Sequence, residues 1–260
     1  MTRTAVITGA TSGIGAAYAK RLAADGYDLI ITGRRQEIIK KLVDDLTDKH
    51  GIKVKVLIVE LSDDHDIQKV IDAINSTDDV EVLINNAGFD PDEEHFMGIE
   101  LRDAERMIKV HQIVPVRLAY AVVPKMEKRR KGTIINVSSG GAFLPSPNII
   151  IYGATKAFLK MFSESLYMDL RGKGIKVQVL CPGFTRTDFH RELSEERYKK
   201  ILSNFHWMTA DEVVDYSLKC LKKNKRPICI PGIRNRLYTA LIPVIPKALY
   251  YRIALKKAGA

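Results

Sequence analysis

Seven short segments rich in β-branched and other apolar residues recur along the chain, separated by stretches with helical periodicity. The segments are Thr4 to Thr8, Tyr27 to Thr32, Val54 to Val59, Val80 to Ile84, Gly132 to Ser138, Ile175 to Leu180 and Pro227 to Ile230. Strands that alternate with helices form parallel βαβ units, whose sheet is covered by helices on both faces. The pattern therefore predicts an α/β fold with a doubly wound parallel sheet of about seven strands.

Length and composition predict one domain over residues 1–260. The chain has 260 residues, of which 46% are apolar, enough for one substantial core, and it contains no obvious linker. Ser62 is the predicted N-cap of one helix, and Thr209 with Glu212 three residues later forms a predicted capping box. Residues 184–208 are the least regular part and are long for a connection between a strand and a helix.

The first predicted strand runs directly into a glycine-rich turn, which is followed by a helical pattern from Ala16 to Ala24. Glycines at such a turn let the backbone approach a pyrophosphate, which then lies at the positive end of the helix. A tight turn without a ligand is the alternative, but the position in a βαβ unit favours a nucleotide. The candidate cofactor-binding residues of this turn are Gly9, Thr11, Ser12, Gly13, Ile14 and Gly15.

The end of the second predicted strand carries Arg34 and Arg35, where sites that prefer NAD usually place a carboxylate. Asp28 is the nearby acid, but it begins that strand and is too far from the C-terminal edge. Because a guanidinium group pairs with a phosphate, the two arginines predict NADP(H) as the cofactor. The alternative is that both arginines only begin a solvated helix.

Tyr152 and Lys156 are four residues apart, so on a helix they share one face about one turn apart. A nearby ammonium stabilises a phenolate and lowers the pKa of the tyrosine from its usual value of about 10, which favours proton exchange near neutral pH. Ser139 lies thirteen residues upstream of Tyr152, after a strand-like run, where its hydroxyl could hold a carbonyl oxygen. Chance pairs of this spacing on solvated helices are common, so the pair alone is a weak signal.

Together and in this order, these motifs resemble the short-chain dehydrogenase/reductase family, which has a Rossmann fold. The resemblance covers roughly residues 2–232 and includes Asn85-Asn86-Ala87-Gly88 and the segment that begins with Pro182-Gly183. It implies an NADP(H)-dependent oxidoreductase that interconverts a carbonyl and an alcohol, assembled as a homodimer or homotetramer. In it, Tyr152 is the proton donor, Ser139 orients the carbonyl and Lys156 binds the nicotinamide ribose. The implied cofactor contacts are Glu60, Leu61, Asn86, Ala87, Gly88, Tyr152, Lys156, Pro182, Gly183, Phe184, Thr185 and Thr187.

Two positions depart from the family pattern. Glu60 stands where an aspartate commonly contacts the adenine, and its extra methylene lets it reach a different atom. His111 replaces an asparagine regarded as the fourth catalytic residue, whose backbone carbonyl holds a water beside the lysine. Because Pro115 at i+4 has no N–H, the carbonyl of His111 loses its helical partner and is free for that water. One hypothesis is that this carbonyl role survives, and the other is that His111 only packs at a kinked helix.

Aromatic and apolar residues predict the substrate class. By the family's arrangement, a mostly apolar substrate is expected, such as an acyl chain, a sterol-like ring or a bulky ketone. Core packing explains some of these side chains equally well. The residues expected to line or cover the substrate site are Phe89, Phe96, Phe143, Leu144, Phe184, Phe189, Phe205, Trp207 and Met208.

The net charge of +10 is concentrated near the C-terminus. From Lys219 onward there are eleven Lys and Arg and no Asp or Glu, whereas residues 1–218 hold 30 basic and 31 acidic residues. In an extension at about residues 232–260 these charges are interleaved with apolar residues, which predicts a surface for anionic lipid or an acidic partner. A subunit contact, or a packed helix with solvated lysines, is the alternative.

Several classes of protein are disfavoured. The three cysteines, Cys181, Cys220 and Cys229, are widely spaced and suggest neither a disulfide framework nor a metal site. No signal peptide is evident, and no apolar stretch approaches the roughly 20 residues that span a bilayer. We therefore expect a cytoplasmic enzyme without a nucleic-acid partner, with peripheral membrane contact as an option. The alternatives to an enzyme are a catalytically silent NADP-binding regulator and a lipid- or membrane-surface-binding protein.

Overall fold

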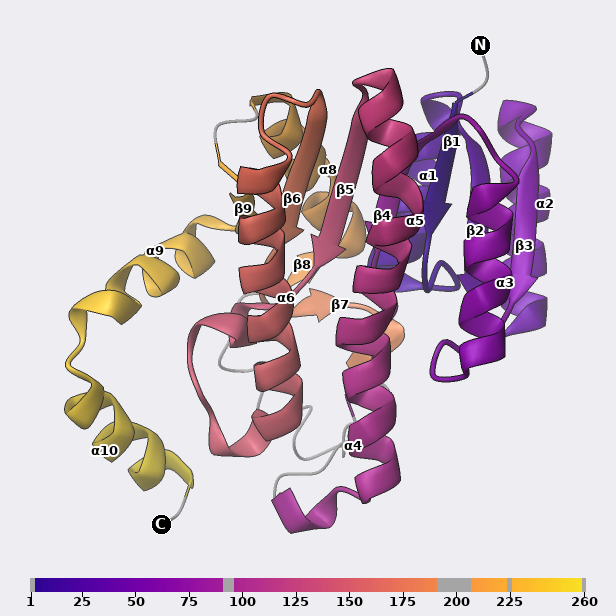
Figure 1. Ribbon diagram of the computed structural model, residues 1–260. Coiled ribbons are helices and arrows are strands. Elements are labelled where there is room, and N and C mark those ends of the chain that lie inside the picture. The colour runs from indigo at the N-terminus through magenta and orange to yellow at the C-terminus, as the bar shows by residue number, and fades with distance from the viewer. Residues whose placement is uncertain (1–2, 91–95, 191–206, 224–225, 259–260) are drawn as a thin grey trace.

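The centre of the computed structural model, which describes residues 3–90, 96–190, 207–223 and 226–258, is a seven-stranded parallel sheet (Figure 1). The strand order is β3-β2-β1-β4-β5-β6-β9. The strands are β1 (Thr4–Ile7), β2 (Asp28–Gly33), β3 (Val54–Ile58), β4 (Val80–Asn85), β5 (Gly132–Val137), β6 (Ile175–Leu180) and β9 (Ile228–Cys229). All seven predicted strands and the doubly wound α/β fold are therefore confirmed.

Helices cover both faces of this sheet (Figure 1). The helices are α1 (Gly13–Ala24), α2 (Gln36–His50), α3 (Asp64–Asn75), α4 (Leu101–Ile108), α5 (Val114–Arg129), α6 (Ile150–Asp169), α8 (Ala210–Lys223), α9 (Ile233–Leu241) and α10 (Lys247–Ala258). Since successive strand side chains point to opposite faces, each strand supplies two cores. In β1, Ala5 and Ile7 pack in the core that includes α1, α2 and α8, whereas Val6 packs in the core that includes α3 and α5.

The strand order reverses between β1 and β4, and this reversal positions the site. The chain runs from β1 outward to β2 and β3, then returns to place β4 on the other side of β1. Both strands are parallel, so the loops that follow them leave the sheet at the same edge. Crevices at such switch points are where doubly wound folds bind ligands.

Two helix starts were predicted from capping patterns, and one of them is confirmed. The Thr209 N–H donates to Glu212 Oε2 (2.8 Å) and the Glu212 N–H donates to Thr209 Oγ1 (3.2 Å), which is a capping box at the start of α8. The prediction of Ser62 as an N-cap is wrong. Asp63 caps α3 by accepting from the Asp66 N–H (3.0 Å), because the Ser62 hydroxyl donates instead to Glu60 (3.0 Å).

Two parts of the chain add detail that the strand pattern did not predict. In the irregular region, β7 (Thr185–Arg186) and β8 (Met208–Thr209) form a short parallel pair, while residues 191–206 lie outside the described part of the chain. Between α4 and α5, the π-helical turn η2 (Lys109–Ile113) carries His111. Such turns insert an extra residue into a helix and are frequent at functional sites.

The last described residues, 233–258, form a C-terminal arm that stands beside α6 at the edge of the molecule (Figure 1). It consists of α9, η6 (Ile242–Val244) and α10. The Tyr250 hydroxyl donates to the carbonyl of Pro145 and so ties α10 to the loop before α6. Within the residues that the structure describes, no helix is long and apolar enough to cross a membrane.

Candidate functional site

A cavity of about 1110 Å³ lies at the carboxyl ends of the strands. Every predicted catalytic or cofactor-binding residue except Gly15 and His111 lines it. Gly15 supports the turn from beneath, since a Cβ there would come within 2.2 Å of the Gly9 carbonyl oxygen. His111 is buried behind Gly88, where a Cβ would come within 2.8 Å of its Nε2. The fold therefore gathers residues from distant parts of the sequence around one cavity.

The glycine turn and the segment after β4 form one hydrogen-bonded unit. The Asn86 side-chain amide donates to the carbonyls of Thr8 (3.0 Å) and Gly9 (2.9 Å). In return, the Thr8 hydroxyl accepts from the N–H groups of Asn86 and Ala87, each at 3.0 Å. Gly9 and Gly13 have φ of +66° and +56°, a conformation that favours glycine. The backbone of the turn is thus fixed and open to close approach, as a cradle for a pyrophosphate must be.

Two guanidinium groups stand at the C-terminal edge of β2. Arg35 donates to the hydroxyls of Thr11 (3.2 Å) and Ser12 (2.7 Å) and pairs with Asp188 (2.8 Å). Arg34 pairs with Glu60 (3.2 Å). Asp28, by contrast, lies at the other end of β2 and accepts from the Lys53 N–H (2.7 Å). Each arginine at this edge is therefore balanced by a carboxylate, and a phosphate bound here would replace Glu60 or Asp188 as its partner.

Glu60 is held by several donors. Its carboxylate accepts from the Ser62 N–H (3.1 Å) and hydroxyl (3.0 Å), and it pairs with Arg34 and with Arg106 (3.3 Å). Burial raises the pKa of this carboxyl, but the hydrogen bonds from Ser62 and the charge of Arg34 outweigh burial and hold the pKa below its usual value. Glu60 is therefore ionised, and its ion pair with Arg34 holds the guanidinium group at the wall of the cavity.

Ser139, Tyr152 and Lys156 face the cavity from β5 and α6. Ser139 follows β5 and accepts from the Gly141 N–H (3.0 Å). Tyr152 and Lys156 lie one turn apart on α6, with Lys156 Nζ 5.6 Å from the centroid of the Tyr152 ring. Lys156 is buried, and its ammonium donates to the Val137 carbonyl (3.1 Å). The sheet end and the first turns of α6 thus fix all three side chains.

Burial dominates the ionisation of this pair, contrary to the expectation that Lys156 lowers the pKa of Tyr152. Burial raises the pKa of Tyr152 above its usual value of 10.0, and the hydrogen bond with Ser139 opposes the rise only in part. Burial also lowers the pKa of Lys156 from 10.5 to about 8. For both groups the loss of hydration outweighs the hydrogen bond or nearby charges that oppose it. At neutral pH, Tyr152 is therefore a phenol and Lys156 is still charged.

The side chain of His111 is engaged at both ring nitrogens. Nε2 accepts from the Phe89 N–H (3.1 Å), and Nδ1 lies 2.8 Å from the Thr155 hydroxyl. Burial, followed by the charge of Lys156, holds the pKa of His111 well below its usual value. The ring is therefore held by specific hydrogen bonds, and the hypothesis that His111 only packs at a kinked helix stays a prediction. The hypothesis about its carbonyl stays a prediction.

The substrate side of the cavity is partly as predicted. Phe89, Leu144, Phe184 and Phe189 line it, and the Phe189 ring lies 5.8 Å from that of Tyr152. The prediction fails for four residues, and Phe205 lies outside the described residues. Phe96 is exposed, Phe143 lies under the ammonium of Lys160, Trp207 packs against Phe184 and Met208 packs against the core.

The C-terminal arm supplies part of the wall, which the sequence motifs did not predict. Asn235 packs on the segment after β6 so closely that a Cβ on Gly183 would come within 2.5 Å of its Nδ2. The aromatic residues of the extension were the signal available for this contact. Asp90, after β4, is a further lining residue that no motif marks. The lining residues from the arm are Arg234, Asn235, Tyr238, Thr239 and Tyr250.

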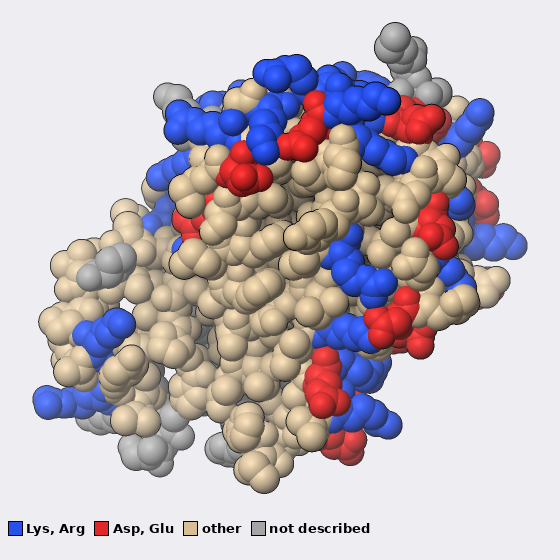
Figure 2. Space-filling model, viewed as in Figure 1, with Lys and Arg blue, Asp and Glu red and all other residues tan. Residues whose placement is uncertain are grey.

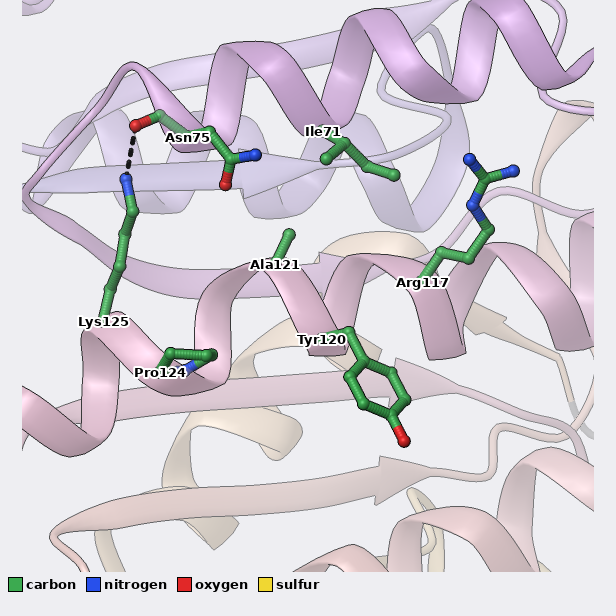
Figure 3. A pocket seen from close by; sticks show the side chains of 7 residues that line it. All are labelled: Ile71, Asn75, Arg117, Tyr120, Ala121, Pro124 and Lys125. Carbon is green, nitrogen blue, oxygen red and sulfur yellow. Dashed lines mark hydrogen bonds between the residues drawn. The ribbon is translucent and has the colours of Figure 1, made fainter.

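A second hollow, of about 470 Å³, lies outside the cavity between α3 and α5 (Figure 3). The positively charged side chains at this hollow, Lys125 and Arg117, lie on α5 and bind groups of α3. Lys125 Nζ donates to the carbonyls at the C-terminal end of α3, including that of Asn75 (2.7 Å), and Arg117 pairs with Asp64 (2.8 Å). This hollow therefore has a structural explanation. In the described part of the chain, no three His, Cys, Asp or Glu side chains are grouped as metal ligands.

The fold and the cavity define a nucleotide-binding oxidoreductase, and comparison with known proteins gives its family. Residues 3–198 match the short chain dehydrogenase family, and the chain belongs to it. The chain is 33% identical over 220 residues to the 3-oxoacyl-[acyl-carrier-protein] reductase FabG of Aquifex aeolicus, covering 83% of this chain and 88% of that protein. It is 34% identical over 186 residues to the very-long-chain 3-oxoacyl-CoA reductase of Anas platyrhynchos, covering 70% of this chain but only 60% of that protein.

Among solved structures, a short-chain dehydrogenase from Sphingobium yanoikuyae in complex with NADPH superposes with a TM-score of 0.80. It is 31% identical to this chain, and the alignment covers 94% of this chain and 96% of the other. The Rossmann-type fold and a nicotinamide cofactor are therefore shared with a close structural neighbour.

Proposed function

We propose that this protein is an NADP(H)-dependent oxidoreductase that interconverts a carbonyl and an alcohol on a mostly apolar substrate. One observation carries the proposal: Ser139, Tyr152 and Lys156 line the same cavity as the glycine turn and the two arginines. A proton donor and a dinucleotide cradle thus share one enclosed volume. Without that shared cavity, each motif would have a simpler structural explanation.

The cofactor end of the site follows from the cradle. When bound, NADPH supplies the hydride. The glycine turn and the first amides of α1 bind the pyrophosphate, and Arg34 and Arg35 bind the 2′-phosphate. Lys156 binds the nicotinamide ribose, and the segment from Pro182 to Thr187 holds the nicotinamide. These residues lie at the carboxyl ends of parallel strands and in the first turns of α1 and α6, which preserves their spacing.

The proton is supplied at the other end of the cavity. The Ser139 hydroxyl holds the carbonyl oxygen, and Tyr152 gives its phenolic proton to that oxygen as the hydride arrives at carbon. Because burial keeps the pKa of Tyr152 above its usual value, the phenol stays protonated at neutral pH, the state that reduction requires. The charge of Lys156 then stabilises the phenolate that is left. The ionisation of the site thus favours the reductive direction.

Apolar side chains around Tyr152 support a bulky or acyl substrate. Phe89, Leu144, Ile149 and Phe189 face the cavity there. Two relatives are named as reductases of 3-oxoacyl thioesters, which present a ketone at the end of an apolar chain. We therefore place a ketone with a large apolar substituent at the head of the list of substrates to try.

The test is NADPH oxidation by the purified protein over a panel of ketones. The panel contains long- and short-chain 3-oxoacyl thioesters, a steroid ketone and a bulky diaryl ketone, with NADH run in parallel. We expect turnover with NADPH that increases with the apolar size of the ketone. Tight NADPH binding without turnover on the whole panel would instead support a catalytically silent regulator.

We also propose that the protein assembles through the face formed by α5 and α6. Figure 2 shows that this face is uncharged over α6 and toward α5, with charged residues gathered at its upper edge and along one side. Large side chains exposed there include Tyr120 (79%), Phe158 (40%), Met161 (64%) and Met168 (66%). Burying such a face is favourable by roughly 25 cal/mol per Å². Light scattering of the wild type is expected to give a dimer or tetramer, and of Met161→Lys a smaller species.

The exposed apolar residues of the C-terminal arm favour a second interaction, with a lipid surface. On α10, Leu249, Tyr251 and Ile253 are each more than 40% exposed; Leu249 and Ile253 share one face of the helix, and Tyr251 lies on the opposite side. No Asp or Glu lies beyond Lys219, so two arms would repel each other, whereas anionic lipid would attract them. The arm also lines the cavity, so docking would bring an apolar substrate to its mouth. Flotation with anionic vesicles, but not with neutral ones, is the expected result.

A further inference from the structure

A chain of hydrogen bonds connects the loop after β4 to the backbone of Tyr152 through His111. The Phe89 N–H donates to His111 Nε2 (3.1 Å), and His111 Nδ1 lies 2.8 Å from Thr155 Oγ1. The Thr155 hydroxyl donates in turn to the carbonyl of Tyr152 (2.8 Å). Three elements, the loop, the π-helical turn η2 and helix α6, are thereby joined at the centre of the site.

The partners leave one assignment of the protons. A backbone N–H can only donate, so Nε2 must carry a lone pair. The hydroxyl proton of Thr155 is already given to the Tyr152 carbonyl, so Nδ1 must be the donor to Thr155. The ring is therefore neutral and in the Nδ1–H tautomer. A protonated Nε2 would face the Phe89 N–H, and two donors would oppose each other in a buried site.

The surroundings of the ring also exclude its charged form. His111 is 1% exposed, and the groups that face it from α6 are the ammonium of Lys156 and the phenol of Tyr152. Asp90 acts on Lys156 and Tyr152, and it is Lys156 whose charge opposes protonation of the imidazole. A second buried cation beside Lys156 would be strongly disfavoured. Both the hydrogen bonds and the surrounding charges therefore keep the His111 ring neutral between pH 5 and 8.

The ring contacts of His111 show what such a fixed imidazole holds in place. The His111 and Tyr152 rings meet edge to face, with centroids 5.8 Å apart and planes at 80°. On another side, the Phe189 ring lies 5.8 Å from the Tyr152 ring. His111 therefore constrains both parts of the catalytic tyrosine: its ring by direct contact and its backbone through Thr155. A displacement of the phenol by even about 1 Å can cost a hundredfold in rate.

We infer that His111 is a positioning residue for Tyr152, working as a neutral clamp between Phe89 and Thr155 and taking no part in proton exchange. The inference rests on the proposed function in so far as Tyr152 is the proton donor. It assigns to the imidazole side chain a role that is separate from that of the backbone carbonyl. It also explains the need for glycine at position 88, because a Cβ there would come within 2.8 Å of Nε2 and break the clamp.

Kinetic variants test the clamp at each of its links. His111→Phe keeps the ring contact and removes both hydrogen bonds of the imidazole, while Thr155→Val removes the hydroxyl that links His111 Nδ1 to the Tyr152 carbonyl and keeps the bond from the Phe89 N–H to Nε2. Each is expected to lower kcat roughly tenfold, the equivalent of one lost hydrogen bond, with KM for NADPH changed by less than about threefold. The double variant is expected to be no slower than the slower single one, because both changes break the same chain. Thr155→Ser, which keeps the hydroxyl, is expected to restore kcat.

The pH profile separates positioning from proton transfer. The profile of kcat/KM between pH 5 and 8 is expected to have the same shape in the wild type and in His111→Phe. His65→Phe, at an exposed histidine on α3, is the matched control and is expected to leave both rate and profile unchanged. Loss of an ionisation in His111→Phe, or additive effects in the double variant, would overturn the clamp and make His111 an acid–base group.

A spectroscopic readout keeps the inference testable when no substrate is found or when the kinetic variants His111→Phe and Thr155→Val do not fold. Long-range ¹H–¹⁵N correlation spectra of the wild type report the tautomer of each of the six histidines, and the His111 signals are assigned by their absence in His111→Gln. We expect a neutral Nδ1–H ring from pH 5 to 8. A ring that titrates near pH 6.5, or the Nε2–H tautomer, contradicts the clamp. Failure of the ketone panel alone, with this tautomer observed, would count against the proposed function and leave the clamp standing.

Discussion

The end of the cavity around Tyr152 and the C-terminal arm line the same volume, but one is built from buried, paired polar groups and the other from exposed apolar and basic ones. Around Tyr152, polar groups are buried and paired: Lys156 with the Val137 carbonyl, and His111 with Phe89 and Thr155. Along the arm, apolar side chains such as Leu241 and Leu249 are exposed, and every charge is positive. The first region is complete within the chain, whereas the second exposes surface that an outside partner would cover.

This difference indicates how each region contributes. Proton transfer requires atoms held within a few tenths of an ångström, so the site is built on strand ends and the first turns of a helix. Binding to an apolar or anionic surface depends on exposed area and charge, so it tolerates a helix held mainly at one end. Substitutions should therefore change rates steeply in the first region, and change affinity gradually in the second.

Tyr152→Phe gives the sharpest test of the first region. Removing the phenolic proton donor is expected to lower kcat by about a thousandfold, since positioned acids contribute roughly 10²- to 10⁴-fold. NADPH affinity should stay within about threefold of the wild type, measured by fluorescence titration. Tyr18→Phe is the matched control, because Tyr18 is a buried tyrosine whose hydroxyl donates to Ser217 outside the cavity. It should lower thermal stability slightly and leave kcat unchanged. A fully active Tyr152→Phe variant refutes the mechanism.

The buried charge of Lys156 gives the next largest effect, on stability. The unfolded chain keeps this proton up to a pKa of 10.5, whereas the folded protein releases it at about 8. Between these values the unfolded state binds more protons, so the contribution of Lys156 to stability rises as pH rises from 8 toward 10.5, and it is unfavourable below 8. Lys156→Met should therefore stabilise the cofactor-free protein at pH 7, by on the order of 3 kcal/mol at most.

Urea unfolding of the wild type and Lys156→Met at pH 7, 8 and 9 measures this effect. The gap between the two should be largest at pH 7 and should narrow at pH 9, because the wild type then loses its buried charge. The same variant should have little catalytic activity. A gap that widens with pH would show that the ammonium is stabilised in the folded protein, against the burial argument.

Arg34→Asp tests the basic edge of β2. We expect the ratio of kcat/KM with NADPH to that with NADH to fall roughly ten- to hundredfold, since the carboxylate repels a 2′-phosphate and accepts from a ribose hydroxyl. Arg106→Gln is the control, because Arg106 also pairs with Glu60 but does not line the cavity. Unchanged selectivity in Arg34→Asp, or an equal change in Arg106→Gln, would remove the phosphate assignment.

The sequence predicted those parts of the molecule that depend on local pattern. Alternating strands and helices, the glycine turn and the spacing of Tyr152 and Lys156 are each read from neighbouring residues, and the structure brings them to one cavity. The capping box at Thr209 is local in the same way, and it is also confirmed. Such features are determined by periodicity and backbone geometry, which a short window of sequence contains.

What the sequence did not predict depends on contacts between distant segments. The pKa of Tyr152 rises because distant segments of the folded chain surround its phenol, and no spacing of residues reports that burial. The links of His111 to Phe89 and Thr155 join residues 22 and 44 positions away. Asn235 reaches the cavity only because the arm returns to Gly183. The substrate wall is likewise a tertiary feature, which is why aromatic composition predicted only part of it.

The arm is tested by changing its exposed apolar residues and leaving those that line the cavity. The triple variant Leu241→Ser, Leu249→Ser, Ile253→Ser is expected to bind anionic vesicles at least tenfold more weakly, since each inserted side chain contributes on the order of 1 kcal/mol or more. Ile38→Ser with Ile58→Ser, at residues 41% and 44% exposed on α2 and β3, is the control. Both proteins should reduce a water-soluble ketone at the wild-type rate.

The oligomeric state of the same triple variant decides between the two partners that its surface could have. If vesicle binding is lost and light scattering shows an unchanged assembly, the exposed residues face lipid. If the assembly dissociates while vesicle binding stays, the arm is a subunit contact. The exposed apolar residues of the arm are then covered by a second copy of the chain. Vesicle binding at increasing salt concentration measures the electrostatic contribution of the arm. Attraction between the basic arm and anionic lipid weakens as the Debye length falls from about 10 Å at 0.1 M to 3 Å at 1 M.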